Sequence, residues 1–436
     1  MNYTSFCELN FKNPKQHLSA LETPLGMRSF GQSVAFCNRC GLCLQSCPFY
    51  ILSLEEPFSP RGYNQTIRFL LKEGLSPVRS RKKLLELATS CTLCGRCIQA
   101  CPGQVPTAQH ILELRRLLGK NFLPFTLRRL MRLRSNYPKI FYGLARIGLF
   151  LRRIGIVKLL RFSGLSCLLG LRWINQMDKM IPRSSKEARK QWKEILQKKE
   201  ENPSLIYIPS LETELFLPEV GINMWKLACA KHRPVLWTHT PTGLFEYVYG
   251  NLREARKQIK KLIERIDALN KKEIPILTDS IDVYNFFKEA ASLFEEYPQW
   301  KERTLQFAQQ VIFATDLFPE NLKAPTPFTT PVALEYGALF SRQSKPFQTA
   351  EQKLHTLFAE NFVQCMDRQA DLPAFGYSFY AKDKATQIRA LALRPLENQH
   401  VGTVVVLSGW AMMEASCRKR KMLPSLKVLH VAQLNG

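Results

Sequence analysis

The chain has 436 residues, 45% of them hydrophobic and 22% charged, and a formal net charge of +26. This length allows two or three domains, since a single core rarely outgrows about 250 residues, and the hydrophobic content excludes a largely disordered chain. We find neither a signal peptide nor the roughly 18 nearly uncharged residues of a membrane-spanning helix. We therefore expect a cytoplasmic protein, in which clustered cysteines bind metal more often than they form disulfides.

One cysteine pattern occurs twice in the first quarter of the chain, as CNRCGLCLQSCP and CTLCGRCIQACP. Each copy has three cysteines spaced by two residues, then a fourth after three more residues and directly before a proline. The cysteines are Cys37, Cys40, Cys43 and Cys47, then Cys91, Cys94, Cys97 and Cys101. We expect an N-terminal tail over residues 1–27 and a domain holding both copies over residues 28–118.

This pattern predicts two 4Fe–4S clusters. A short loop with three thiolates can wrap a cubane cluster, and in two-cluster ferredoxins the fourth cysteine of each run binds the other cluster. We therefore assign the ligands as Cys37, Cys40, Cys43 and Cys101 for cluster 1, and Cys91, Cys94, Cys97 and Cys47 for cluster 2. Zinc takes its ligands in two pairs, which would leave the third cysteine of each run unused.

The 43 residues between the two runs have helical patterning, as in QTIRFLLKEG and SRKKLLELATSC. This insertion is longer than the linker of small bacterial ferredoxins and indicates the helical ferredoxin module of respiratory iron–sulfur subunits.

The chain here resembles the iron–sulfur subunit of glycolate oxidase and related cysteine-rich proteins. The resemblance includes SCPFYILSLEEPFSPRGYNQTIRFLLKEG after the first run and CPGQVPTAQHILELRR after the second. The first segment contains the acid and the Ser-Pro-Arg-Gly unit of that family, here Glu56, Ser59, Pro60, Arg61 and Gly62. An arginine near a cluster would raise its reduction potential, although a surface charge at a helix start explains Arg61 equally well.

A basic segment follows, which we predict to be a helical linker over residues 119–202. Between Arg115 and Lys199 there are 22 Lys and Arg against three acids, so +19 of the net charge lies here. The pattern predicts amphipathic helices with a basic face. An acidic partner subunit is our preferred contact for that face, and an anionic membrane surface is the second. We expect no nucleic acid, because no recognised binding module accompanies the charge.

An α/β domain is predicted over residues 203–436, so the fold class is α+β overall. Buried strands are expected at residues 204–210, 233–239, 273–279 and 401–409, with an amphipathic helix at 251–270. Alternating strands and helices favour a largely parallel sheet. The resemblance implies two cysteine-rich-type repeats in this domain, at about 203–325 and 326–436.

The cysteines that characterise those repeats in the resembled family are missing from this chain. The family's Cys-Cys-Gly, its second glycine, its upstream cysteine and its late Gly-Cys correspond here to Pro241-Thr242-Gly243, Gly250, Leu211, Ala374-Phe375-Gly376 and Gly409-Trp410. Surviving glycines indicate that tight turns are kept. The lost thiolates remove the iron–sulfur chemistry of that domain, so we describe the repeats as degenerate.

Residues outside the two runs offer little chemistry. The remaining cysteines, which we expect to be small buried hydrophobes, are Cys7, Cys167, Cys229, Cys365 and Cys417. His239, at a predicted strand end, is a weak candidate ligand. We identify no catalytic residue, because no nucleophile elbow, phosphate loop or dinucleotide fingerprint is present. Without a flavin or nicotinamide site, the chain should not oxidise a substrate by itself.

These observations predict a non-catalytic electron-transfer subunit of a hetero-oligomeric oxidoreductase. It would relay electrons from a flavoprotein dehydrogenase, of the type that oxidises glycolate or lactate, to a respiratory acceptor. Peripheral attachment at the cytoplasmic face of the membrane, through the basic helices, is an option. Alternatives are an iron–sulfur subunit of a glycerol-3-phosphate dehydrogenase or heterodisulfide-reductase-like complex, or a redox-sensing or structural iron–sulfur protein.

Overall fold

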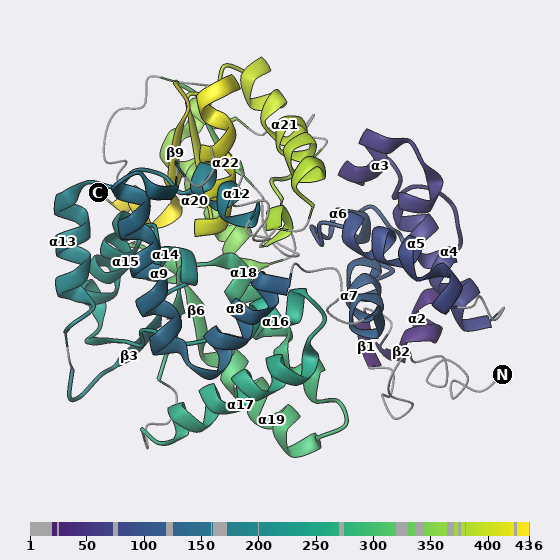
Figure 1. Cartoon of the computed structure of the whole chain (residues 1–436), viewed down its shortest axis with the longest axis horizontal. Coiled ribbons are helices and arrows are strands. Elements are labelled where there is room, and N and C mark those ends of the chain that lie inside the picture. The colour runs from purple at the N-terminus through teal and green to yellow at the C-terminus, as the bar shows by residue number, and fades with distance from the viewer. Residues whose placement is uncertain are drawn as a thin grey trace.

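The computed structural model describes residues 20–23, 26–72, 77–118, 125–157, 159, 172–198, 200–269, 274–319, 330–335, 344–363, 370–373, 376–379, 381–422 and 425–435. This described part is rich in helices and contains three small sheets, two of them parallel. Figure 1 shows the purple and blue N-terminal helices grouped at one end of the molecule and the α/β part at the other. No helix in the described ranges is long and apolar enough to span a membrane.

The N-terminal group begins with an antiparallel hairpin, β1 (Ala20–Thr23) and β2 (Gly26–Ser29). Its helices are α2 (Phe30–Ala35), α3 (Pro48–Ser53), α4 (Pro60–Lys72), α5 (Pro77–Ser90), α6 (Arg96–Gln99) and α7 (Thr107–Leu118). The helical patterning between the cysteine runs thus corresponds to α3, α4 and α5, which bring the two runs together.

A buried histidine fastens three of these helices. His110 of α7 meets Asn64 Oδ1 of α4 through Nδ1 at 2.7 Å and Ser33 Oγ of α2 through Nε2 at 2.9 Å. Burial lowers the pKa of His110 to about 3, so the ring is neutral in the fold.

The basic segment packs against the α/β part. Its helices are α8 (Phe125–Asn136), α9 (Pro138–Arg153), α12 (Arg172–Met180) and α13 (Lys186–Ile195). Trp192 of α13 lies against Gly221 of α15 (Pro218–Lys231), where an added Cβ would come within 2.6 Å of the indole. Figure 1 shows these helices among the labelled elements of the α/β part.

The first parallel sheet has the order β4-β3-β5-β6. Its strands are β3 (Leu205–Ile208), β4 (Pro234–Leu236), β5 (Ile276–Thr278) and β6 (Val311–Phe313). The first three lie within predicted strands, and α17 (Leu252–Asp267) lies within the predicted amphipathic helix. Strand β6 was not predicted, because its three residues directly follow α19 (Pro298–Gln310) and show no period of their own.

The second parallel sheet has the order β7-β8-β9. Its strands are β7 (Val332–Glu335), β8 (Thr403–Val406) and β9 (Lys427–His430), and only β8 was predicted. Its helices are α20 (Lys345–Phe358), α21 (Lys382–Asn398) and α22 (Gly409–Met422). The strands of the α/β part are thus parallel, as the alternation predicted, and they are divided between two small sheets.

The scattered cysteines only partly follow the prediction that they are buried. Cys229, near the end of α15, is exposed, so the prediction is wrong for this residue. Cys417 is half-buried and lies 3.6 Å from Arg389 Nη1. Cys7, Cys167 and Cys365 lie outside the described residues.

Candidate metal centre

The two cysteine runs adopt the same backbone conformation at their start. Arg39 and Leu93, each preceding the second cysteine of its run, both have φ of 60°, and the glycines after that cysteine, Gly41 and Gly95, have φ of 85° and 76°. Successive amides in loops of this kind form concavities that bind anions, including iron–sulfur clusters. The Leu93 N–H already donates to Cys91 Sγ at 3.3 Å.

One group of thiols gathers around Cys43. Burial raises the pKa of Cys43 to about 11, and repulsion from Cys37, Cys101 and Cys40 adds to the rise. Three of these four cysteines come from the first run and the fourth from the second. The structure therefore brings together the residues predicted to hold cluster 1.

A second group gathers around Cys97. Burial raises its pKa well above the ordinary value, with added repulsion from Cys91, Cys94, Cys47 and then Cys43. Figure 1 shows α6, which carries Cys97, beside α3, α5 and α7. A small cavity of about 20 Å³ is lined by Cys47, Cys91, Cys94 and Cys97 together. Because Cys43 of the first group also raises the pKa of Cys97, the two thiol groups lie next to each other.

These thiols match the donor chemistry of an iron–sulfur cluster. Within the described residues, no three His, Cys, Asp or Glu side chains are placed to hold a single metal ion. A tetrahedral zinc site would need sulfur atoms about 3.8 Å apart. A multi-iron cluster takes one thiolate on each of several irons and so needs a wider ring of cysteines. When bound, such a cluster supplies one-electron transfer.

The hydroxyl of Tyr63 supports this fit. The side chain is only 1% exposed and lines the small cavity, and its oxygen has no hydrogen-bond partner among the described residues. Burial raises its pKa, with contributions from Cys47 and Cys91. A buried hydroxyl without a partner costs about 1–3 kcal/mol. A cluster sulfur in this cavity would give it an acceptor.

Arg61 holds the first cysteine loop. Its Nη1 donates to the Arg39 carbonyl at 3.3 Å, and a Cβ on Gly41 would lie 3.0 Å from that nitrogen. Its Nε pairs with Glu56 at 2.6 Å, which raises the arginine's pKa, and Cys43 adds to the rise. The structure thus places this arginine beside the first thiol group, as one of the two interpretations of the sequence expected.

Arg115 likewise holds the second cysteine loop through a backbone carbonyl, and no sequence pattern singled it out. This fully buried guanidinium donates to the carbonyls of Ala88 at 2.9 Å, Cys91 at 2.8 Å and Val248 at 2.9 Å. Burial raises the pKa of Cys91 to about 11, while Arg115 opposes the rise. The adjacent Arg116 belongs to the same motif, so spacing could not distinguish the two.

A carboxylate from the α/β part also reaches the second group. Asp371 pairs with Arg96 at 3.1 Å, and Arg96 donates to the Ser46 carbonyl at 3.1 Å. After burial, the Asp371 charge is the largest cause that raises the pKa of Cys94. Because Asp371 is distant in sequence, only the folded chain reveals its position.

Two glycines that survive from the family's cysteine motifs make close contacts. Gly250 has φ of 74°, and a Cβ there would lie 2.6 Å from Arg116 N. Gly376 has φ of 76°, and a Cβ there would lie 2.5 Å from Tyr249 Oη. The turns therefore keep their glycines for steric reasons. Ala374 and Phe375 lie outside the described residues.

His239, the weak candidate ligand, lies apart from the thiols. Its Nε2 is 3.3 Å from Glu214 Oε1, and its backbone N–H donates to the same carboxylate. Its ring stacks edge-on to Tyr142 with centroids 4.5 Å apart. These contacts give the residue a structural role at the turn after β4.

Comparisons with known proteins also support an iron–sulfur domain in this chain. Residues 33–105 match the family model described as a 4Fe-4S dicluster domain. A probable glycolate oxidase iron–sulfur subunit of Bacillus subtilis is 24% identical over 314 residues, covering 67% of this chain and 68% of that protein. An Hdr-like menaquinol oxidoreductase iron–sulfur subunit 2 of Archaeoglobus fulgidus is 29% identical over 108 residues, covering 21% and 20%. No solved structure matches significantly. The chain therefore carries a 4Fe–4S dicluster domain, and its resemblance to the glycolate oxidase iron–sulfur subunit family is confirmed.

Proposed function

We propose that this chain is the electron-transfer subunit of a hetero-oligomeric oxidoreductase and carries two 4Fe–4S clusters. The ligands would be Cys37, Cys40, Cys43 and Cys101 for cluster 1, and Cys91, Cys94, Cys97 and Cys47 for cluster 2. The observation that carries the proposal is the exchange between the runs, since Cys43 lies near Cys101 while Cys97 lies near Cys47. Adjoining clusters suit a relay of single electrons.

The exposure of the two groups suggests the direction of the relay. Cys40 of the first group is exposed, whereas Cys47 of the second is buried. Cluster 1 would exchange electrons with a flavoprotein dehydrogenase at the surface, and cluster 2 would pass them inward. Because this chain resembles the Bacillus relative, its partner would oxidise glycolate or a similar 2-hydroxy acid. The name of the Archaeoglobus relative supports the quinone pool as the acceptor.

Helix α9 gives a reason to propose peripheral attachment at the cytoplasmic face of the membrane. Its side chains Ile140, Leu144, Ile147 and Phe150 are 50–57% exposed and follow each other at helical spacing. Arginines in the same helix supply the positive charge that anionic headgroups attract. An acidic protein partner would explain the charge but not this apolar stripe.

The domain division remains part of the proposal, with the dicluster domain at 28–118, the basic helices at 119–202 and the α/β domain at 203–436. The two parallel sheets fall separately within residues 203–325 and 326–436, which supports a pair of repeats.

The ligand exchange can be tested with Cys101→Ser combined with Arg61→Gln. Cys101→Ser should abolish the cluster beside Arg61, so the reduction potential of the surviving cluster should not respond to Arg61→Gln. In Cys47→Ser the surviving cluster should respond. If the cluster that remains in Cys101→Ser changes its reduction potential on Arg61→Gln, each run binds its own cluster.

Electron transfer is tested by anaerobic purification of the tagged chain with its partners. We expect a flavoprotein to co-purify and a 2-hydroxy acid to reduce the clusters. Recovery of clusters that bleach under mild oxidant and change the affinity for a partner, with no flavoprotein, would instead identify a redox sensor.

A further inference from the structure

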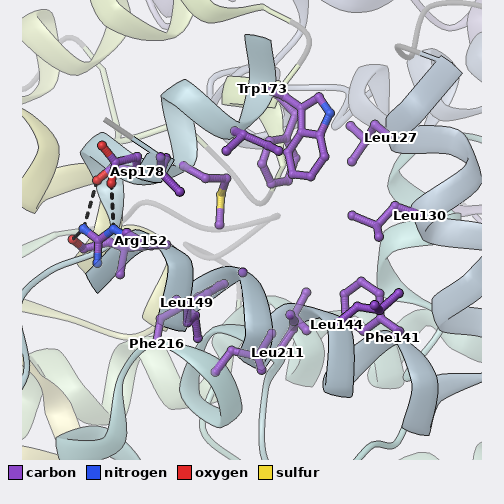
Figure 2. A pocket seen from close by; sticks show the side chains of 18 of the residues that line it. Leu127, Leu130, Phe141, Leu144, Leu149, Arg152, Trp173, Asp178, Leu211 and Phe216 are labelled. Carbon is purple, nitrogen blue, oxygen red and sulfur yellow. Dashed lines mark hydrogen bonds and ion pairs between the residues drawn. The ribbon is translucent and has the colours of Figure 1, made fainter. Parts of the chain in front are cut away.

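An apolar pocket of about 360 Å³ lies between the basic helices and the α/β part. Figure 2 shows Leu130 of α8, Leu144 of α9 and Trp173 of α12 pointing into it, with Leu211 at the start of α14 (Leu211–Leu215). The pocket has the size and lining of a site for a small apolar ligand.

Four polar residues are among those that line this apolar pocket: Arg134, Arg152, Asn175 and Asp178. Arg152 is already satisfied, because it pairs with Asp178 at 2.7 Å and donates to the Ile181 carbonyl at 3.1 Å (Figure 2). Arg134 lies among the lining residues, is only 6% exposed, and its Nε has no hydrogen-bond acceptor within the described ranges. A ligand with a carbonyl oxygen would supply the missing acceptor.

A short turn joins the pocket to the second thiol group. Phe379 lines the pocket and belongs to the turn η7 (Tyr377–Phe379). At the other end of the turn, Tyr377 donates to the Ser90 carbonyl at 3.1 Å, directly before Cys91. One 3₁₀ turn therefore separates the pocket wall from the proposed cluster 2 loop.

Helix α16 (Leu244–Val248) makes a second, independent connection. Phe245 lines the pocket, and the carbonyl of Val248 accepts from Arg115 Nη1 at 2.9 Å. Arg115 Nη2 binds the Cys91 carbonyl at 2.8 Å. The pocket and the second thiol group are thus neighbours in the folded chain.

The pocket also lies at positions where the resembled family has cysteines. Leu211 stands at one such position and lines the pocket. Trp410 stands at another and packs on Phe379 with ring centroids 5.2 Å apart. Apolar side chains therefore surround a place where the resemblance would put thiolates.

The pocket borders the exposed apolar face of α9. Leu144 is both 50% exposed and part of the lining, so it marks the boundary between the pocket and that face. Ile140 and Ile147, one turn away on either side, are 55% and 56% exposed. A molecule dissolved in a membrane under α9 could enter without crossing water.

We propose that this pocket binds a lipid-soluble quinone, with a ring carbonyl accepting from Arg134 and the isoprenoid tail leaving past Leu144. The inference rests on the proposed electron-transfer function, for which it supplies the acceptor site. Reduction of a quinone to a quinol takes two electrons and two protons. The two electrons come from the two reduced clusters, one from each, and the protons come from water.

The test measures binding of decyl-ubiquinone and of a short-chain naphthoquinone to the intact, oxidised, cluster-loaded protein by equilibrium dialysis. Gly148→Phe is the blocking variant, because Gly148 lines the pocket and an added Cβ meets no described atom within 4 Å. Gly143→Phe is its control, since that glycine lies in the same helix, has the same open space and does not line the pocket.

We expect Gly148→Phe to weaken quinone binding tenfold or more and Gly143→Phe to leave it unchanged. Arg134→Met should weaken it about tenfold through loss of the donor. Equal binding in both glycine variants would overturn the site, and palmitate binding in place of either quinone would overturn the ligand class. Clusters that reduce normally in a chain that binds no quinone would refute only the pocket, whereas irreducible clusters would refute the proposed function.

Discussion

Arg115 donates a hydrogen bond from Nη2 to the carbonyl oxygen of Cys91 at 2.8 Å. The same guanidinium binds the carbonyls of Ala88 and Val248 and is fully buried. It therefore fixes the second cysteine loop to the end of α5 and to the α/β part at once. A cation here also offsets the negative charge of a reduced cluster.

Replacing Arg115 with Gln should lower the free energy of unfolding by about 3 kcal/mol, because three buried carbonyls lose a charged donor. Anaerobic urea denaturation of the cluster-loaded protein measures this loss. Arg253→Gln is the control, since that arginine is exposed on α17 and its loss should cost about 0.5 kcal/mol or less. Equal losses in both variants would contradict the role of Arg115.

Arg61→Gln should make the reduction potential of one cluster more negative by tens of millivolts, because a fixed cation beside the first thiol group is removed. A redox titration followed by electron paramagnetic resonance measures both clusters. Arg68→Gln removes the same charge from the same helix about 10 Å farther along. An equal shift in that variant would mean that only the overall charge matters.

Tyr63→Phe should lower the potential of the other cluster, because the buried hydroxyl lines the cavity of Cys47 and Cys91 and hydrogen bonds to sulfur raise cluster potentials. The cluster that responds to Arg61→Gln should stay unchanged. Tyr142→Phe removes a buried hydroxyl beside Glu214 instead and serves as the control. Unchanged potentials in Tyr63→Phe would show that this hydroxyl finds no sulfur acceptor.

His110 should make stability depend on pH. Its pKa is about 3 in the fold, against an ordinary value of 6.5, so below pH 6.5 the unfolded chain binds a proton that the folded chain does not. Stability should fall by about 2 kcal/mol between pH 6.5 and 5 through this residue. Anaerobic denaturation at several pH values should show a smaller slope in His110→Gln than in the exposed control His355→Gln. Identical slopes would exclude a neutral buried ring.

The sequence predicted the parts of the fold whose signals are local. The spacing of Cys37 to Cys47 was enough to predict an iron–sulfur module, and the apolar runs at β3, β5 and β8 were enough to predict buried strands. Strands β6, β7 and β9 were not predicted, because runs of three or four residues are too short to show a period of their own. The exposure of Cys229 could not be predicted, because a lone cysteine does not indicate which face of its helix it occupies.

The rest of the site depends on contacts between distant residues. Asp371 reaches Arg96, and Tyr377 reaches Ser90, across most of the chain, and no spacing rule connects such pairs. The sequence predicted that the basic helices are amphipathic, but not what their apolar residues contact. The apolar residues between their arginines, such as Leu144 and Trp173, line a pocket that only the packed helices create (Figure 2).

A redox titration of the intact, anaerobically purified chain, followed by electron paramagnetic resonance and paired with iron analysis, would establish whether the chain carries two clusters. We expect about eight iron atoms per chain and two clusters that each accept one electron reversibly. Because the two thiol groups adjoin each other, the spectra of the fully reduced clusters should broaden one another. Half the iron with a single cluster signal, or bound zinc in place of iron, would show that the chain does not carry two 4Fe–4S clusters.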